Sequence, residues 1–321
     1  MARIDQVTSA WHALRLHLAF RKFCRENPLC QDEVGIVMQH GVGDHVLVAG
    51  LAAAIGRRHG ARVVLAGRPG MRFVAELYPS VARYVELPAF CVGQEVGAPV
   101  VAPATWTYGH FRGMELARVV GYDTMGLLDA YRCLFGLDRE AALERPRLPT
   151  EIERRQAADF LRARGYVPGR AVLISRMARS TPVADEARSL FPELERKLEE
   201  RGYRTLDNDQ RNDGSGGSCD IPLGMLRAVV LEAGGIAAVR NGLCDLLCDL
   251  PVPVVIFYAD KHYLGGPLFR GTSVAGYGYT EHVGEFKIDA LTGGGIRAVA
   301  QAAAKFPYRV TTLFSSETKL P

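Results

Sequence analysis

The sequence predicts an α/β protein with two doubly wound domains, each built on a parallel β-sheet. Short apolar runs alternate with helical stretches along most of the chain, which is the pattern of a parallel sheet covered by helices. A length of 321 residues exceeds one small domain and fits two of ordinary size. Residues 144–149 interrupt the alternation with charge and proline, so we expect domains at 1–148 and 149–321.

The chain opens with an amphipathic stretch. Basic residues surround Trp11, Leu14, Leu18 and Phe23, and this pattern predicts a helix over residues 9–24. We expect its apolar face to pack against the body of the protein. The alternatives are that this face binds a membrane surface or a second subunit. The oligomeric state cannot be predicted from the sequence.

The first domain continues as a series of strands and helices. The apolar run 34–38 is expected to be a buried strand, followed by a glycine turn and a helix. Prolines in the segment 97–103 indicate an edge strand, and residues 104–113 look like an irregular loop. The other expected elements are strands at 61–67 and 84–87, and helices at 46–55, 73–78 and, in two segments, up to about residue 137.

The second domain repeats the alternation after the linker. Pro222 suits the first turn of the helix expected at 222–233, because the amide hydrogens of the first turn have no partner within the helix. We leave open that the last helix of the chain packs back on the first domain. Strands are expected at 171–175, 203–206, 236–239 and 252–258, and helices at 151–165, 191–201, 222–233 and 291–306.

Composition narrows the class of protein. A hydrophobic fraction of 48% describes a soluble globular protein, and the net charge of +4 comes without the Lys/Arg block of a nucleic-acid binder. The seven cysteines lie mostly in apolar segments, which indicates a reducing compartment. Cys244 and Cys248 share a helical face, but buried helical cysteine is commoner than a metal site, so we expect no metal.

Charged residues interrupt the N-terminal apolar residues, and no apolar run has membrane-spanning length. We therefore expect a cytoplasmic protein, with a peripheral contact at the inner face of the membrane left open.

The turn Gly41-Val42-Gly43-Asp44 is the most informative stretch of the chain. A glycine turn between a strand and a helix brings bare backbone close to a ligand. A carboxylate repels phosphate, so Asp44 better suits a base acting on a hydroxyl. The alternative is that Asp44 caps a helix starting near His45.

Motifs in both halves resemble the heptosyltransferase-type glycosyltransferases, the ADP-heptose:lipopolysaccharide family (family 9) and its relatives. The second half resembles the family's donor domain in a strand ending at Ser175 and in the loop 240–245. The first half shares a glycine turn closed by Asp, a strand ending in Gly and a helix broken at Tyr-Pro, here Gly41-Val42-Gly43-Asp44, Leu65-Ala66-Gly67 and Glu76-Leu77-Tyr78-Pro79.

This resemblance implies the GT-B architecture, in which two Rossmann-like domains face a cleft. The first domain would bind the acceptor and the second a nucleotide-diphosphate sugar, with inversion at the anomeric carbon and neither metal nor cofactor. Asp44 would be the catalytic base, with Gly41, Gly43 and His45 on the acceptor side. The donor-binding residues would be Ser175, Arg176, Arg179, Asn208, Asp209, Arg240, Asn241, Gly242 and Leu243.

The loop at Gly242 departs from the family, which usually presents an acid, Thr or Ser, Gly and a nearby His. Arg240 adds a positive charge instead, and a guanidinium suits diphosphate because it can bind two oxygens at once. The alternative is that Arg240 pairs with Asp245 or Asp249. Arg176 and Arg179 could likewise belong to a solvated loop.

We therefore expect an inverting, metal-independent glycosyltransferase that acts on a bacterial surface glycan or a lipid-linked acceptor. A nucleotide-sugar epimerase of similar fold and a non-catalytic protein that binds a nucleotide-sugar or a partner are the alternatives. The sugar, the nucleotide, the acceptor and the linkage cannot be identified from the sequence.

Overall fold

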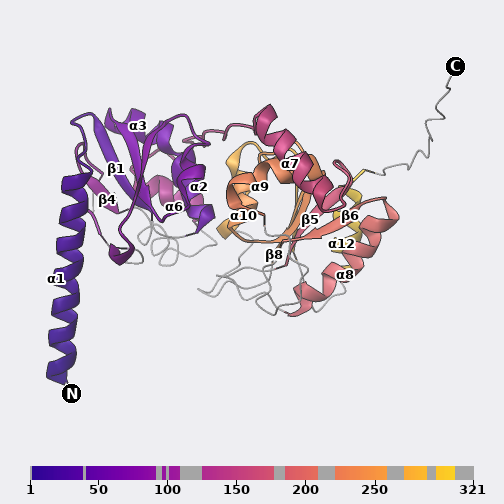
Figure 1. Ribbon diagram of the computed structural model, residues 1–321, viewed down its shortest axis with the longest axis horizontal. Helices are drawn as coiled ribbons and strands as arrows, with labels where there is room; N and C mark the ends of the chain where they lie inside the picture. The colour runs from indigo at the N-terminus through magenta and orange to yellow at the C-terminus, as the bar shows by residue number, and fades with distance from the viewer. Residues whose placement is uncertain are drawn as a thin grey trace.

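The computed structural model contains two α/β domains that lie side by side (Figure 1). It describes residues 2–38, 41–91, 96–98, 101–108, 125–176, 185–208, 221–258, 271–287 and 294–307.

The N-terminal sheet is parallel, with strand order β3-β2-β1-β4. Its strands are β1 (Glu33–Met38), β2 (Arg62–Gly67), β3 (Val81–Glu86) and β4 (Trp106–Tyr108). Its helices are α1 (Ala2–Glu26), α2 (Val42–Gly50), α3 (Ala52–His59), α4 (Arg72–Ala75), the short η1 (Ala89–Cys91) and α6 (Leu127–Leu134).

The C-terminal sheet is also parallel, with strand order β6-β5-β7-β8-β9. Its strands are β5 (Ala171–Ser175), β6 (Arg204–Asp207), β7 (Ile236–Val239), β8 (Val254–Tyr258) and β9 (Val283–Lys287). Its helices are α7 (Glu151–Ala163), α8 (Asp185–Glu200), η2 (Leu223–Met225), α9 (Leu226–Ala233), α10 (Gly242–Leu247), η3 (Ala275–Tyr277) and α12 (Gly294–Ala304).

The central strand β1 shows why the apolar run forms a doubly covered sheet. All six of its residues are buried, and alternate side chains enter two different clusters. Ile36 packs with α2 and α3 on one face, whereas Val37 packs with α1 on the other. Burial of both faces removes the polar alternation that a solvent-facing sheet would show.

The edge strand β4 corrects one expectation. We expected a strand at 97–103 and a loop at 104–113, but the strand is Trp106–Tyr108, and Ala98 makes an isolated bridge to Thr107. Residues 99–100 and 109–113 of these two segments lie outside the described part of the chain. Prolines cannot donate to a strand ladder, whereas aromatic and β-branched residues suit one. The ring of Trp106 also fills the space left by Gly35, where a Cβ atom would lie 2.3 Å from Trp106 Cε3.

Most other elements fall where the sequence predicts them. The helix expected at 46–55 begins earlier, at Val42, and is divided at Leu51 into α2 and α3. The strand β9 was not predicted, because it lies at the sheet edge and its five residues, VGEFK, form no continuous apolar run. One of the two helical segments expected before residue 137 falls on residues 109–124, outside the described part of the chain.

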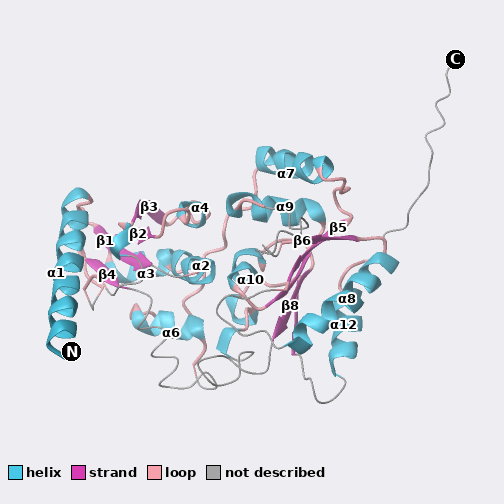
Figure 2. Ribbon diagram, turned by 60° about the horizontal axis from the view of Figure 1, so that its bottom comes forward, coloured by secondary structure: helices cyan, strands magenta, loops and turns pink. Residues whose placement is uncertain are grey.

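The last helix, α12, packs on α8 and β9 within the C-terminal domain, contrary to the alternative that it returns to the N-terminal domain. Figure 2 shows α8 and α12 together on one face of the C-terminal sheet, with α7 and α9 on the other.

The segment 144–149 is bound closely to the N-terminal domain. The amide of Glu144 donates to the Gly50 carbonyl oxygen at 2.7 Å, and the amide of Arg147 donates to the Leu77 carbonyl oxygen at 2.8 Å. A capping box between Thr150 and Glu153 then starts α7. This segment is therefore the linker between the two domains, and its backbone is hydrogen-bonded to the N-terminal domain.

Candidate functional site

Two matching strand–turn–helix units, one from each domain, meet at the domain junction. In the N-terminal domain β1 leads into α2, and in the C-terminal domain β7 leads into α10; the two helices pack against each other. Figures 1 and 2 both show α2 next to α10. Ligands of open parallel sheets bind beyond the carboxyl ends of the strands, so this junction is the candidate site.

Two glycines allow the helices to approach this closely. A Cβ atom on Gly43 would lie 2.3 Å from Asp245 Oδ2, and one on Gly242 would lie 2.7 Å from the backbone nitrogen of Gly43. Gly41 is different, because a Cβ atom there would meet only Asp44 Oδ2, at 3.7 Å. Contact between the domains therefore requires Gly43 and Gly242, which gives these glycines a role that the sequence did not suggest.

Asp44 is the third residue of α2 and does not cap it. The N-cap is Gly41, with extended backbone and no side-chain cap, so the alternative that Asp44 caps a helix starting near His45 was wrong. The carboxylate is half-buried, and its Oδ1 accepts a hydrogen bond from the Tyr131 hydroxyl at 2.9 Å. The first turn of a helix also stabilises negative charge.

Tyr131 is the functional candidate that sequence reasoning missed. It lies in α6, far from the turn in sequence, and its side chain is fully buried. Burial, followed by the charge of Asp44, raises the pKa of Tyr131 well above its usual range. The phenol therefore stays protonated and serves as a hydrogen-bond donor to Asp44. Nothing in the sequence of α6 marks this tyrosine among the other residues of the helix.

His45, expected on the acceptor side, is buried beneath the turn. Its Nδ1 lies 3.0 Å from the Gly41 carbonyl oxygen. Its Nε2 lies against β2, where a Cβ atom on Gly67 would be only 2.5 Å away. The imidazole therefore braces the turn against the sheet.

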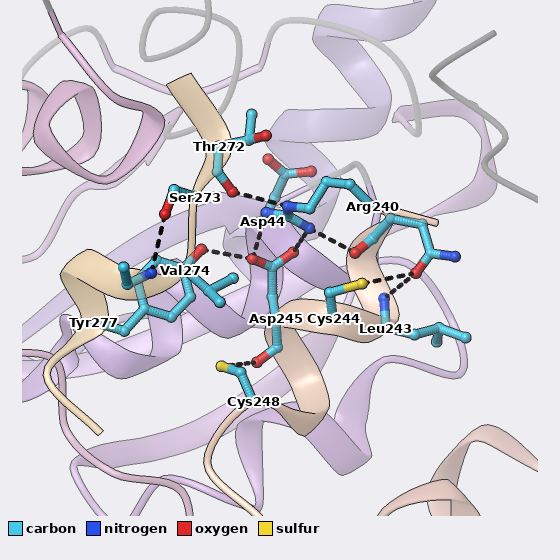
Figure 3. Close-up of polar contacts among 12 residues, drawn as sticks. Asp44, Arg240, Leu243, Cys244, Asp245, Cys248, Thr272, Ser273, Val274 and Tyr277 are labelled. Carbon is cyan, nitrogen blue, oxygen red and sulfur yellow. Dashed lines mark hydrogen bonds and ion pairs between the residues drawn. The ribbon is translucent and has the colours of Figure 1, made fainter. Parts of the chain in front are cut away.

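Arg240 makes the pairing that the sequence left as an alternative. Its Nη1 and Nη2 donate to the two carboxylate oxygens of Asp245 at 2.8 and 2.7 Å, and its Nε donates to the Thr272 carbonyl oxygen at 2.8 Å (Figure 3). Burial alone would lower the pKa of Arg240, but the adjacent Asp245 carboxylate raises it well above its usual range. The guanidinium therefore remains charged and is engaged by protein acceptors.

The Asp245 carboxylate also accepts a hydrogen bond from the Tyr277 hydroxyl at 2.5 Å. Asp249, the other partner considered for Arg240, pairs with Arg227, whose Nη2 lies 2.7 Å from Asp249 Oδ2. Both ion pairs are almost completely buried. They hold the region around α10 in one conformation.

Asn241 connects the ends of two strands. Its Oδ1 caps α10 by accepting from the Leu243 amide at 2.9 Å, and its Nδ2 donates to Ser175 Oγ at 3.2 Å. Ser175 is the last residue of β5 and is buried. The structure thus brings Ser175, Asn241, Gly242 and Leu243 together, as the expected donor set requires.

Arg176, which follows β5 directly and was expected to bind the donor, is also paired within the protein. Arg176 forms ion pairs with Glu195 and Asp207, and its guanidinium lies 5.6 Å from the centre of the Phe191 ring. Asn208 donates its backbone amide to the Ile174 carbonyl oxygen at 2.9 Å. Arg179 and Asp209, the remaining donor candidates, lie outside the described residues.

The cysteines of α10 behave as buried side chains. The Cys244 thiol donates to the Val239 carbonyl oxygen, and the Cys248 thiol to that of Asp245. Burial raises the pKa of Cys244 to about 11, which keeps the thiol protonated. In the part of the chain that the structure describes, no three His, Cys, Asp or Glu side chains gather as a metal site would need.

Comparison with known proteins identifies the fold. No family model matches the sequence, and no curated protein matches it. In structure the chain is similar to a family 9 glycosyltransferase from Veillonella parvula, with a TM-score of 0.57, 12% identity and coverage of 86% of this chain and 98% of that one. It is also similar to the E. coli ADP-heptose LPS heptosyltransferase II, with a TM-score of 0.58, 11% identity and coverage of 84% and 97%.

A third similar structure is TibC from enterotoxigenic E. coli, a dodecameric, iron-containing heptosyltransferase in complex with ADP-D-β-D-heptose. Its TM-score is 0.50 at 14% identity, over 80% of this chain and 64% of that one. The expected α/β architecture of two Rossmann-like domains is confirmed, and the resemblance to the heptosyltransferase family is confirmed at the level of the fold.

Proposed function

We propose that this protein is an inverting glycosyltransferase that needs no bound metal. It would move a sugar from a nucleotide-diphosphate sugar to a hydroxyl of a bacterial surface glycan or a lipid-linked acceptor. The observation that carries this proposal is the Asp44 carboxylate at the domain junction, held by the Tyr131 hydroxyl at 2.9 Å, in a fold shared with glycosyltransferases.

The chemistry of a single displacement requires a base on the acceptor side. The acceptor oxygen attacks the anomeric carbon while the base removes its proton, and the nucleoside diphosphate leaves. Asp44 meets this need because the Tyr131 hydroxyl donates a hydrogen bond that orients its carboxylate.

The donor side of the proposed site comprises Ser175, Asn241, Gly242 and Leu243, which the structure brings together at the ends of β5 and β7. We assign Arg240 to shaping this loop, because its contacts with Asp245 and Thr272 engage the guanidinium. Stabilisation of the leaving diphosphate then falls to backbone amides and to the predicted Arg179. The ADP-heptose bound to TibC supports a nucleotide-diphosphate sugar as the class of donor.

The first experiment identifies the donor and then tests the base. A thermal-shift screen with ADP-, GDP-, UDP- and CMP-linked sugars reports which nucleotide binds. With that donor and a glycolipid extract as acceptor, release of the nucleoside diphosphate measures turnover. Asp44→Asn is expected to lower the rate about 10²–10⁴-fold while leaving the donor thermal shift intact.

Asp129→Asn is the matched control, because Asp129 lies on α6 in an ion pair with Arg132 that is partly exposed. Turnover of Asp44→Asn at the rate of the unmodified protein would remove the base from the proposal. The anomeric configuration of the product, read by NMR, tests inversion, and an unchanged rate in EDTA is the expected result for metal independence.

The two alternatives give different results in the same assay. An epimerase would convert the nucleotide-sugar without an acceptor and without release of nucleoside diphosphate. A non-catalytic binding protein would show a thermal shift and no turnover of any kind. Either result would replace the transferase assignment.

A further inference from the structure

The helix α1 has one face packed on the N-terminal domain and one face exposed. On the packed face, the Phe23 ring lies 5.0 Å from the Trp106 ring and 5.7 Å from the Phe20 ring. Of the four apolar residues expected to pack on the body of the protein, Phe23 does so, but the expectation was wrong for Trp11, Leu14 and Leu18, which are exposed. Figure 1 shows that α1 also extends well beyond the sheet toward the N-terminus.

The opposite face carries large apolar side chains in water. Trp11 is 61% exposed, Leu14 is 47% exposed and Leu18 is 54% exposed. Their spacing of three and four residues places them along one side of the helix. Three large apolar side chains on one exposed stripe indicate a surface that contacts something other than water.

Basic residues continue the same stripe toward the domain. Arg21 and Arg25 follow Leu18 by three and seven residues, and both are exposed. The acidic residues in the sequence of α1 are Asp5 and Glu26, and Glu26 lies 3.7 Å from Lys22. The exposed stripe is therefore apolar at one end and positively charged at the other.

We propose that this stripe docks the protein on an anionic lipid surface, with the apolar side chains entering the headgroup boundary and the arginines contacting lipid phosphates. Tryptophan beside leucine and arginine on one helix face is the composition of an interfacial helix. Among the described residues, no helix combines the length and apolarity needed to cross a bilayer, so the contact is peripheral. This inference goes beyond the proposed transferase activity and does not depend on it.

Charge favours a lipid surface over a second copy of the chain. Two α1 helices packed along this stripe would bring Arg21 and Arg25 of each copy near a partner that is also basic, whereas anionic headgroups attract both residues. A stable protein interface also buries roughly 800 Å² on each partner, more than three partly exposed side chains supply.

Vesicle cosedimentation tests the proposal with the full chain. Vesicles of phosphatidylethanolamine and phosphatidylglycerol are compared with neutral phosphatidylcholine vesicles. We expect binding to the anionic vesicles that weakens as salt is added, and weak binding to the neutral ones. Equal binding to both, or binding to neither, would overturn the proposal.

Two variants separate the apolar and the charged contributions. The triple change Trp11→Ser, Leu14→Ser and Leu18→Ser should lower vesicle binding at least tenfold, because the buried apolar area is lost. The double change Arg21→Gln and Arg25→Gln should weaken binding to anionic vesicles by about fivefold for each arginine. Unchanged binding by the triple variant would overturn the proposal.

The matched control is the double change Ile152→Ser and Val167→Ser, which removes exposed apolar side chains (69% and 57% exposed) from the C-terminal domain. It should bind vesicles as the unmodified protein does. Asp44→Asn should also bind normally, so failure of vesicle binding and failure of catalysis are distinguishable. Analytical ultracentrifugation gives the competing outcome: a dimer that the triple change dissociates, without vesicle binding, would assign the stripe to a second copy.

Discussion

Two carboxylates occupy nearly equivalent places in the two domains but differ in burial and in their described contacts. Asp44 is the third residue of α2, and Asp245 is the fourth residue of α10. Asp44 is half-buried and accepts a hydrogen bond from a neutral phenol, whereas Asp245 is buried and paired with the guanidinium of Arg240. The same strand–turn–helix geometry thus supports two different roles.

The described contacts suggest different roles for the two carboxylates. A guanidinium in bidentate contact cancels the charge of Asp245 and fixes the loop, which is a structural use. The Tyr131 hydroxyl donates a hydrogen bond that orients the Asp44 carboxylate at the proposed site. We therefore expect changes at Asp245 to affect stability and changes around Asp44 to affect turnover.

The largest effect on stability is expected from Asp245→Ala. This change leaves the charge of Arg240 buried without its partner, which costs about 3–5 kcal/mol in the free energy of unfolding. Urea denaturation measures the loss. The double change Asp245→Ala with Arg240→Met should recover part of it, because no unpaired charge remains. A single variant as stable as the unmodified protein would contradict the structural role.

Gly43→Ala is expected to have the next largest effect. The added methyl group would lie 2.3 Å from Asp245 Oδ2, so α2 and α10 would have to separate. Overpacking of this kind costs about 1–3 kcal/mol. Gly41→Ala is the control, because the nearest contact there is an ordinary 3.7 Å. Thermal denaturation of the two variants should differ clearly, and equal stability would show that the domains do not need this close contact.

The contrast between Gly41 and Gly43 shows what could not be predicted from the sequence alone. The glycine turn, the strand before it and the helix after it follow from apolar runs and glycine spacing. Which glycine is required depends on α10, which lies about 200 residues further along the chain. Tyr131 was missed for the same reason, since its contact with Asp44 exists only in the folded domain.

The elements of the sheets show the same division. Strands such as β1 and β5 were predicted because both are continuously apolar and buried. β4 and β9 were not, because β4 has only three residues and the five residues of β9, VGEFK, form no continuous apolar run. The sequence limited the possible partners of Arg240 to Asp245 and Asp249, and the structure shows that the partner is Asp245.

Tyr131→Phe should reduce turnover about tenfold, an effect smaller than that of Asp44→Asn. The change removes the hydrogen bond to the carboxylate and keeps the buried ring, so folding should be little affected. Loss of a donor disfavours the ionised carboxylate, so the acid limb of the pH–rate profile should move to higher pH. Tyr203→Phe, in the C-terminal core, is the control. A lower rate with an unmoved profile would mean that Tyr131 only supports the structure.

The smallest effect is expected at the linker, where the ion pair is neither buried like that of Asp245 nor part of the site. Arg147 donates to Glu153 through both terminal nitrogens at 2.8 Å, and about a third of each side chain is exposed. This guanidinium, with help from the Thr150 cap, lowers the pKa of Glu153 to about 2 from an ordinary value of 4.5.

A lowered carboxyl pKa stabilises the folded state above pH 4.5, and the contribution is lost as the pH falls from 4.5 toward 2. Because water screens the pair, we expect only about 1 kcal/mol. Glu153→Gln should therefore lose this amount at pH 7 and flatten the decline in stability between pH 4.5 and 2, measured by urea denaturation at several pH values. Glu151→Gln is the control: Glu151 lies two residues before Glu153 and is 62% exposed, so its change should leave the decline in stability unchanged. If the stability of Glu153→Gln still declined steeply between pH 4.5 and 2, the acid sensitivity would come from other groups and not from the Arg147–Glu153 ion pair.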